Sequence, residues 1–143
     1  MMFDRLTSLG KGDGISFKFG GKTGNTRDSH RLIQLGKTKS SEMQTKVVEA
    51  LFISYFEKEE DITSHAVLMS AGLQAGLPEA EVKEWLSSDQ GGSQVDSEVH
   101  DAQSRAISGV PHFTIQDHYE LGGAQEPEAF LEIFERIRTT NVV

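Results

Sequence analysis

The apolar residues of this 143-residue chain change their spacing at Gly109. From about residue 25 to residue 107 they recur every three to four positions, which is the repeat of helices with one buried face. After Gly109 the repeat becomes two, which is typical of strands. A shorter run with a period of two also precedes the helical part, at residues 15–19. The chain therefore predicts an α+β domain in which a large helical segment interrupts a unit that contains strands.

Several helices are expected in the middle of the chain, each bounded by start or stop signals. The first begins after Asn25 or Thr26, both good N-caps, and ends near Lys39. Ser41 and Gln44 have the spacing of a capping box and open the second helix. Later boundaries are expected at Thr63 or Ser64, at Gly76, at Pro78 and at Gly91-Gly92, and a last helical stripe runs through Val95, Val99, Ala102 and Ala106.

The two ends of the chain carry the strand signals. Residues 2–9 predict a short helix, and the alternation of Ile15, Phe17 and Phe19 with polar residues predicts a half-buried strand. Near the other end, residues 113–115 and 119–121 predict a β-hairpin with its turn at residues 117–118. A final helix follows, with a buried face that we expect to comprise Phe130, Phe134 and Ile137.

Charge and cysteine content exclude several classes of function. The net charge of −8 disfavours nucleic acid and anionic membrane surfaces as partners. The chain has no cysteine, so it forms no disulfide, thiolate nucleophile or cysteine-ligated zinc site. Its five histidines show no pair at i, i+4, so we expect no metal site. Without an apolar run near 18 residues or an apolar leader at the start, we expect a cytoplasmic protein.

Three short motifs occur in a fixed order along the chain. They are Asn25-Thr26 with His30-Arg31, then Leu51-Phe52 with Tyr55-Phe56 and Asp61-Ile62, then Gly109-Val110-Pro111-His112-Phe113 followed by Gly123-Ala124-Gln125. Their order and spacing resemble the DsbA-like thioredoxin-fold family over about residues 3–137, in particular its FrnE-like branch. That branch is similar to hydroxychromene-carboxylate isomerases and kappa-class glutathione transferases.

The resemblance implies a partial thioredoxin fold. It makes residues 1–143 a single domain with a large helical insertion at residues 25–107, closed by a C-terminal β-hairpin and helix. In that family a first strand and an active-site helix, carrying Cys-x-x-Cys or a Ser-containing equivalent, precede the parts seen here. We therefore expect this chain to lack that segment and to contain no catalytic residue of its own.

The resemblance also assigns candidate substrate-binding residues. It makes Pro111 a cis-proline, although only about 5–6% of X-Pro bonds are cis, and it lets the main chain of Val110 pair with an extended thiol substrate. Asn25 and His30 lie near the mouth of the family's site, but an N-cap and a helix contact are the favoured roles for them.

Gly123 and Gln125 correspond to the place where related folds bind the anionic end of glutathione, the one candidate cofactor. Glu126 and Glu128 would repel a second carboxylate there, so a loop and cap is the favoured interpretation.

Three functions follow as expectations. The first is a thiol–disulfide oxidoreductase family member that is not redox-active as this cysteine-free chain. The second is a glutathione-dependent isomerase or transferase. The third is a non-catalytic binding or assembly module that uses an exposed sheet edge. The partners expected are a thiol-containing or small-molecule substrate and, through that edge, a second copy of the chain.

Overall fold

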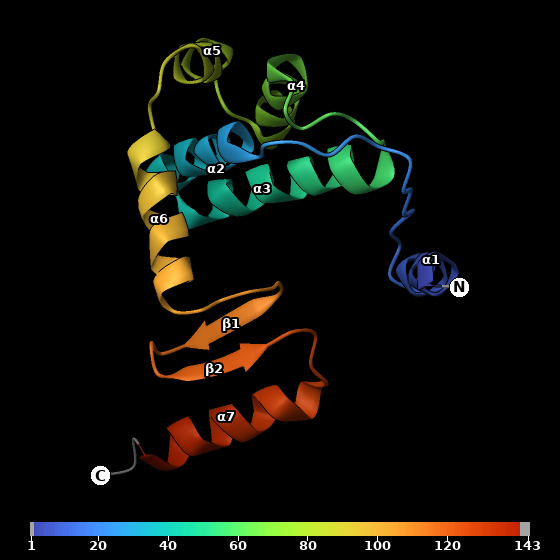
Figure 1. Cartoon of the computed structure of the whole chain (residues 1–143), viewed down its shortest axis with the longest axis vertical. Helices are drawn as coiled ribbons and strands as arrows, with labels where there is room; N and C mark the ends of the chain where they lie inside the picture. The colour runs from blue at the N-terminus through green and yellow to red at the C-terminus, as the bar shows by residue number, and fades with distance from the viewer. Residues whose placement is uncertain (1, 141–143) are drawn as a thin grey trace. The chain divides into compact units, whose positions relative to one another are not determined.

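The computed structural model describes residues 2–140, and the chain separates into two compact units, residues 1–98 and residues 99–143. The first unit holds α1 (Met2–Gly12), α2 (Arg27–Lys39), α3 (Ser41–Phe52), the π-helical turn η1 (Ile53–Glu57), α4 (His65–Ala75), α5 (Glu79–Ser87) and the beginning of α6 (Gly92–Ser104). The second holds the end of α6, β1 (His112–Ile115), β2 (Tyr119–Gly122) and α7 (Pro127–Thr140) (Figure 1). A mostly helical chain with a closing hairpin and helix was expected, and this fold class is confirmed.

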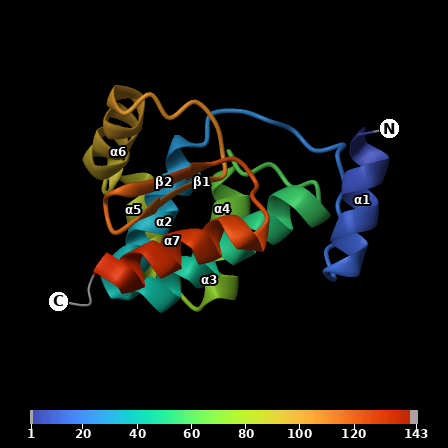
Figure 2. The ribbon, with the colours of Figure 1, turned by 90° about the horizontal axis from the view of Figure 1, so that it is seen from below.

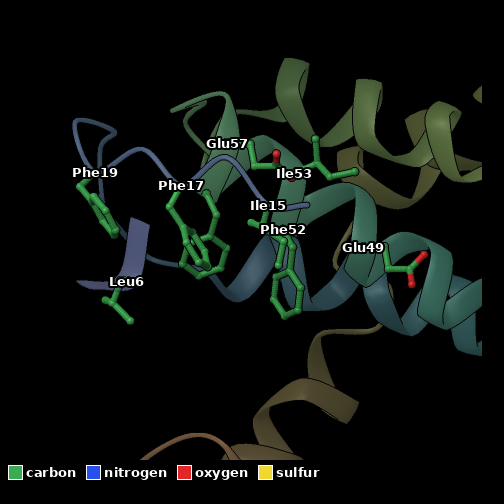
Figure 3. A pocket seen from close by; sticks show the side chains of 9 residues that line it. Leu6, Ile15, Phe17, Phe19, Glu49, Phe52, Ile53 and Glu57 are labelled. Atoms are coloured by element: carbon green, nitrogen blue, oxygen red, sulfur yellow. The ribbon is translucent and has the colours of Figure 1, made fainter. Parts of the chain in front are cut away.

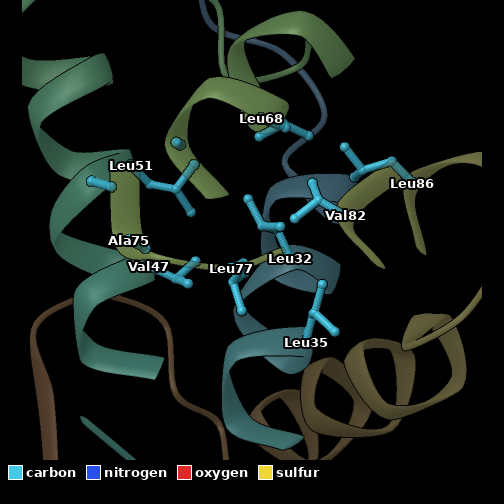
Figure 4. Packing of buried hydrophobic residues seen from close by; sticks show 11 residues of the cluster. Leu32, Leu35, Val47, Leu51, Leu68, Ala75, Leu77, Val82 and Leu86 are labelled. Carbon is cyan, nitrogen blue, oxygen red and sulfur yellow. The ribbon is translucent and has the colours of Figure 1, made fainter. Parts of the chain in front are cut away.

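The first unit is organised around one apolar cluster. α2, α3, α4 and α5 each turn one face inward, and Leu32, Val47, Leu68 and Val82 have no exposed surface (Figure 4). Burying a leucine or valine side chain contributes about 1.5–3 kcal/mol, so this cluster is the main source of stability in the unit. The other buried members are Leu35, Ala50, Leu51, Ala71, Ala75, Leu77 and Leu86.

Local signals place the helix ends close to where the sequence predicts them. α2 ends at Lys39, and α4 ends at Ala75, where the capping residue Gly76 adopts the left-handed conformation at φ +98° that glycine allows without strain. The start of α3 corrects one expectation. Its N-cap is Ser40, whose hydroxyl accepts a hydrogen bond from the N–H of Met43, so Ser41 is already the first helical residue.

The strand predicted at residues 15–19 is absent, because no neighbouring strand pairs with it. Instead, the N–H groups of Ser16, Lys18 and Gly20 donate to Glu57 Oε2 at 3.0 Å, to the carbonyl of Phe56 at 2.8 Å and to Glu59 Oε1 at 2.6 Å. The acceptors lie in η1 and in the turn after it. The segment is therefore tied to a helix end and not to a sheet.

The last two helices also differ from the predicted pattern. α6 ends at Ser104, so Ala106 lies beyond it at φ 55°, and Val99 is exposed. On α7 the most buried residue is Ile133, whereas Phe134 is half exposed. Apolar residues three and four apart share a helix face, but only a defined neighbour decides which of them is buried.

The second unit consists mainly of the hairpin and α7. β1 and β2 pair antiparallel with Phe113 opposite Leu121 and Thr114 opposite Glu120. The rings of Phe113 and Phe130 meet edge to face with centroids 5.0 Å apart, which joins β1 to α7. Figures 1 and 2 both show α7 lying alongside the hairpin. None of the helices within residues 2–140 has the length and hydropathy that a membrane crossing requires.

A buried arginine joins α2 to the chain that follows α5. The Arg31 guanidinium donates to the carbonyls of Gln90 at 2.9 Å, of Trp85 at 2.5 Å and of Ser88. It also forms an ion pair with Asp28 at 2.8 Å. In return, the Trp85 indole N–H donates to the carbonyl of Arg31 at 2.8 Å. Four hydrogen bonds to protein acceptors thus surround this charge, which is what allows an arginine to be buried.

Asp28 links this network to α4 and gives it a pH dependence. The His65 ring contacts Asp28 Oδ2 at 2.8 Å, and this hydrogen bond, with that from Arg31, lowers the pKa of Asp28 below its usual value of 3.8. A carboxyl with a lowered pKa in the folded state stabilises the protein above its unfolded-state pKa. That stabilisation is lost as the pH falls through the lower folded-state pKa.

We therefore expect the Asp28→Asn variant to lose stability at neutral pH and to show a shallower loss of stability below about pH 4 than the wild type. Urea unfolding at pH 7, 4 and 3 measures both effects, and Asp13→Asn, at an exposed position after α1, is the matched control. An unchanged slope between pH 4 and pH 3 in Asp28→Asn would contradict the role given to Asp28.

Candidate functional site

The connection between α6 and β1 contains the most unusual backbone in the second unit. The Val110–Pro111 peptide bond is cis, as predicted from the motif around it. Val110 is 92% exposed. The connection therefore presents Val110 to the outside immediately before the cis bond.

The hairpin holds this connection in place. The N–H of Gly123, just after β2, donates to the carbonyl of Pro111 at 2.8 Å. Gly123 has φ +77°, a conformation that glycine adopts without strain. The strand pairing from His112 onward and the Gly123 hydrogen bond to Pro111 thus hold the connection on the C-terminal side of Val110.

A cleft of about 350 Å³ lies beside Val110 within the second unit. Its size is at the lower end of the range for small-ligand sites. Within residues 2–140, the N–H and C=O groups of Val110 have no hydrogen-bond partner, so they are available to a bound backbone. The lining residues are Arg105, Ala106, Ile107, Ser108, Gly109, Val110, His112, Glu120, Gly122 and Gly123.

One ion pair supplies the charge in the cleft. Arg105 donates to Glu120 Oε1 at 2.5 Å and to Thr114 Oγ1 at 2.9 Å. The hydrogen bond from Arg105 lowers the pKa of Glu120, and the same contact raises the pKa of Arg105. Both groups therefore stay charged at neutral pH, and their charges largely cancel.

His112, the residue after the cis-proline, contributes an unused polar atom. Its Nε2 is buried and has no hydrogen-bond partner among the described residues. Buried polar atoms in folded proteins nearly always have a partner. His112 is thus a polar group beside the cleft whose hydrogen-bonding capacity the folded chain leaves open.

The structure brings four of the predicted site residues together. Val110 and Pro111 lie in the connection, Gly123 bonds to Pro111, and the Gln125 side chain donates to the carbonyl of Gly122 at 2.7 Å. The N–H of Gly123 and one of the two N–H groups of the Gln125 side-chain amide are therefore engaged within the chain. The Gly123 N–H is thus not free to bind the carboxylate of a ligand in this conformation.

The other two predicted residues lie in the first unit, at the start of α2. The Oδ1 of Asn25 accepts a hydrogen bond from the N–H of Arg27 at 2.9 Å, and Nδ1 of His30 contacts the carbonyl of Thr26 at 2.8 Å. The Asn25 contact pairs an N–H of the first turn of α2, which has no partner within the helix. The His30 ring shares the Thr26 carbonyl with the N–H of His30 and the hydroxyl of Ser29.

Eight of the ten lining residues were not among the predicted site residues, and three of these eight carry an ionisable side chain: Arg105, His112 and Glu120. Glu120 could have been found, because the predicted hairpin places it opposite Thr114. Arg105 follows the end of a helix and reaches the sheet only through the folded connection, so no spacing in the sequence indicates it. Among residues 2–140, no three histidine or acidic side chains gather in a way that could hold a metal ion.

Comparison with known proteins adds the family. No curated protein matches the chain. One family model does match, that of the DSBA-like thioredoxin domain, over residues 1–135. The match covers nearly the whole chain, including the helices, the cis-proline connection and the hairpin. The chain therefore belongs to the DSBA-like thioredoxin domain family.

Proposed function

We propose that this chain binds the substrate of a thiol–disulfide oxidoreductase of the DsbA-like type. The order of its motifs also leads us to propose that it belongs to the FrnE-like branch of the family. The substrate is an extended peptide or small molecule with a thiol or disulfide, held by the main chain of Val110. One observation carries the proposal: Val110, next to cis-Pro111, is exposed. The N–H and C=O groups of Val110 have no hydrogen-bond partner within residues 2–140.

The chemistry of the reaction limits what this chain contributes. Exchange between thiols and disulfides proceeds through attack of a thiolate on a disulfide sulfur and forms a mixed disulfide. The 143 residues contain no cysteine, so no residue of this chain can form that intermediate. The thiols must come from the substrate and from a second thiol-bearing molecule, while this chain positions the substrate.

Glutathione-dependent catalysis is the alternative, and the geometry supports it less. It needs free donors near Gly123 and Gln125 for a carboxylate, but the Gly123 N–H and one N–H of the Gln125 side-chain amide bond within the chain. Glu126 and Glu128 add negative charge to the start of α7, where an anion would otherwise be attracted.

Binding of a redox-inert substrate mimic tests the proposal. The probe is an extended peptide with a central S-methylcysteine, followed by calorimetry and by the Val110 amide signal in NMR. Val110→Pro removes the N–H donor, whereas Val110→Thr keeps it together with a β-branched side chain. Losing this one main-chain hydrogen bond, at about 0.5–1.5 kcal/mol, predicts binding weaker by roughly two- to tenfold for Val110→Pro. Val110→Thr should stay within about twofold of wild type.

Equal binding by both variants would show that the Val110 main chain makes no contact with the peptide. Glutathione, titrated in the same calorimeter, tests the alternative, and saturable millimolar binding would favour it over the peptide site. In an insulin-reduction assay we expect no turnover above the uncatalysed rate, because the chain has no thiol. A catalysed rate would contradict this division of roles.

We also infer that the hairpin mediates self-association. The sheet has only two strands within the described residues, so β1 and β2 each have one unpaired edge. Unpaired edges are templates for strands of another molecule. Sedimentation at several concentrations should show a dimer or larger species, whereas a monomer mass at all concentrations would contradict the inference.

A further inference from the structure

The segment before α2 has one occupied edge and one open edge. The N–H groups of Ser16, Lys18 and Gly20 all bond to η1 and the turn after it, which is the alternation of an extended backbone. In such a backbone, neighbouring residues direct their N–H and C=O groups to opposite sides. Those of Phe17 and Phe19 therefore face away from η1.

The groups on that second edge are unpaired. Within residues 2–140 the N–H and C=O groups of Phe17 and Phe19 have no hydrogen-bond partner, and the segment is largely exposed. Two residues with free donors and acceptors, two positions apart, have the repeat with which one strand recognises another. An incoming extended peptide would find four matching partners there.

An apolar groove runs beside this edge. It has a volume of about 720 Å³, and Figure 3 shows the rings of Phe17 and Phe52 projecting in the same direction into it. Phe52 is 57% exposed, a high fraction for an aromatic ring. The apolar lining consists of Leu6, Ile15, Phe17, Phe19, Phe52, Ile53 and Phe56.

Contacts between aromatic rings shape the groove. The centroids of Phe17 and Phe56 are 5.9 Å apart, those of Phe52 and Phe56 are 5.7 Å apart, and those of Phe3 and Phe19 are 4.6 Å apart. The edge and the groove are thus parts of one surface, because Phe17 and Phe19 belong to both. A contiguous exposed apolar surface of this kind typically marks an interaction site.

Two carboxylates, Glu49 and Glu57, are the polar lining of the groove, and no basic residue lines it. Glu57 already accepts a hydrogen bond from the N–H of Ser16. Glu49, exposed on α3, is the carboxylate available to a partner. The negative charge of Glu49 and the net charge of −8 favour a binding partner that carries a basic residue next to its apolar side chains.

We propose that this site binds an extended peptide segment of another protein by strand addition. The segment pairs its main chain with Phe17 and Phe19, inserts every second, apolar side chain into the groove, and carries a lysine or arginine that meets Glu49. The site lies in the first unit, so it does not depend on the function proposed for Val110.

The test uses a fluorescein-labelled peptide, Lys-Val-Thr-Val-Thr-Val-Lys, measured by fluorescence anisotropy against the full chain. Two analogues carry N-methyl groups, one on the valines and the other on the threonines. Strand addition uses only one edge of the peptide, so one analogue should bind at least tenfold more weakly and the other about as well as the parent. Equal binding by both analogues, or no saturable binding of the parent, would overturn the proposal.

Protein variants locate the site. Phe19→Pro and Phe19→Ala both remove the ring, but only the proline removes the N–H, so Phe19→Pro should bind at least fivefold more weakly than Phe19→Ala. Phe52→Ala should weaken binding, whereas Leu73→Ala, at an exposed apolar position on α4, should not. Glu49→Gln should weaken binding of the lysine-flanked peptide and not of a serine-flanked one.

Two results would assign the groove to another occupant and overturn the proposal. If Phe19→Pro abolishes self-association of the chain, the occupant is a second copy. If Phe52→Ala lowers the affinity for the peptide while Phe19→Pro and Phe19→Ala bind it equally well, the groove binds apolar side chains without pairing of the main chains. Circular dichroism shows whether each protein variant is folded. The N-methyl analogues of the peptide test the proposal with the wild-type protein, so they do not depend on the folding of any variant.

Discussion

Replacing Arg31 with methionine is expected to destabilise the first unit by at least about 3 kcal/mol. Methionine fills a similar volume but donates no hydrogen bond. The carbonyls of Ser88 and Gln90 then lose the donor that Arg31 supplies, and that of Trp85 keeps only the Ser88 hydroxyl. Each of these groups that stays shielded from water without a partner costs about 1–3 kcal/mol. Asp28 loses its ion-pair partner as well.

Urea unfolding followed at Trp85, the single tryptophan of the chain, measures this effect directly. Arg31→Lys should fall between methionine and wild type, because an ammonium is a compact donor that cannot span three carbonyls and a carboxylate. Arg136→Met, an exposed change on α7, should stay within about 0.5 kcal/mol of wild type. If Arg31→Met were as stable as that control, the network would contribute nothing to stability.

The second large effect is expected from Leu32→Ala. Leu32 has no exposed surface and lies among residues of α2, α4 and α5 (Figure 4). Removing a buried leucine side chain leaves a cavity and costs about 2–5 kcal/mol. For a chain of this size that corresponds to a fall in Tm of roughly 10 °C or more.

Leu73→Ala is the matched control, because Leu73 is 43% exposed on the outer face of α4. The same chemical change there should cost less than about 1 kcal/mol. Differential scanning calorimetry of the two variants gives the comparison. A loss in Leu32→Ala no larger than that in Leu73→Ala would contradict the placement of Leu32 at the centre of the core.

The parts of the fold that the sequence predicts correctly are those with local physical causes. Gly76 ends α4 because a left-handed residue follows the last turn, and the hairpin follows from alternation on both sides of a short turn. The cis bond before Pro111 was predicted only with the help of the family resemblance. Base rates alone favour a trans bond there.

The parts that the sequence does not predict depend on distant partners. The alternation at residues 15–19 is real, but a strand exists only when a neighbour pairs with it. The burial of Arg31 depends on carbonyls more than fifty residues away, which no local pattern records. Arg105 likewise joins the candidate cleft only because the connection folds back onto β2.

The pairing of β1 with β2 also makes the turn between them a length constraint. The carbonyl of Pro111 accepts the hydrogen bond from the N–H of Gly123 only while the strands keep the register in which Thr114 lies opposite Glu120. One inserted residue at 116–118 would slip the register and direct every side chain of one strand to the other face. The length of this turn therefore fixes the position of the Val110 connection relative to β2. Engineered insertions that leave this site intact have to be placed in other loops.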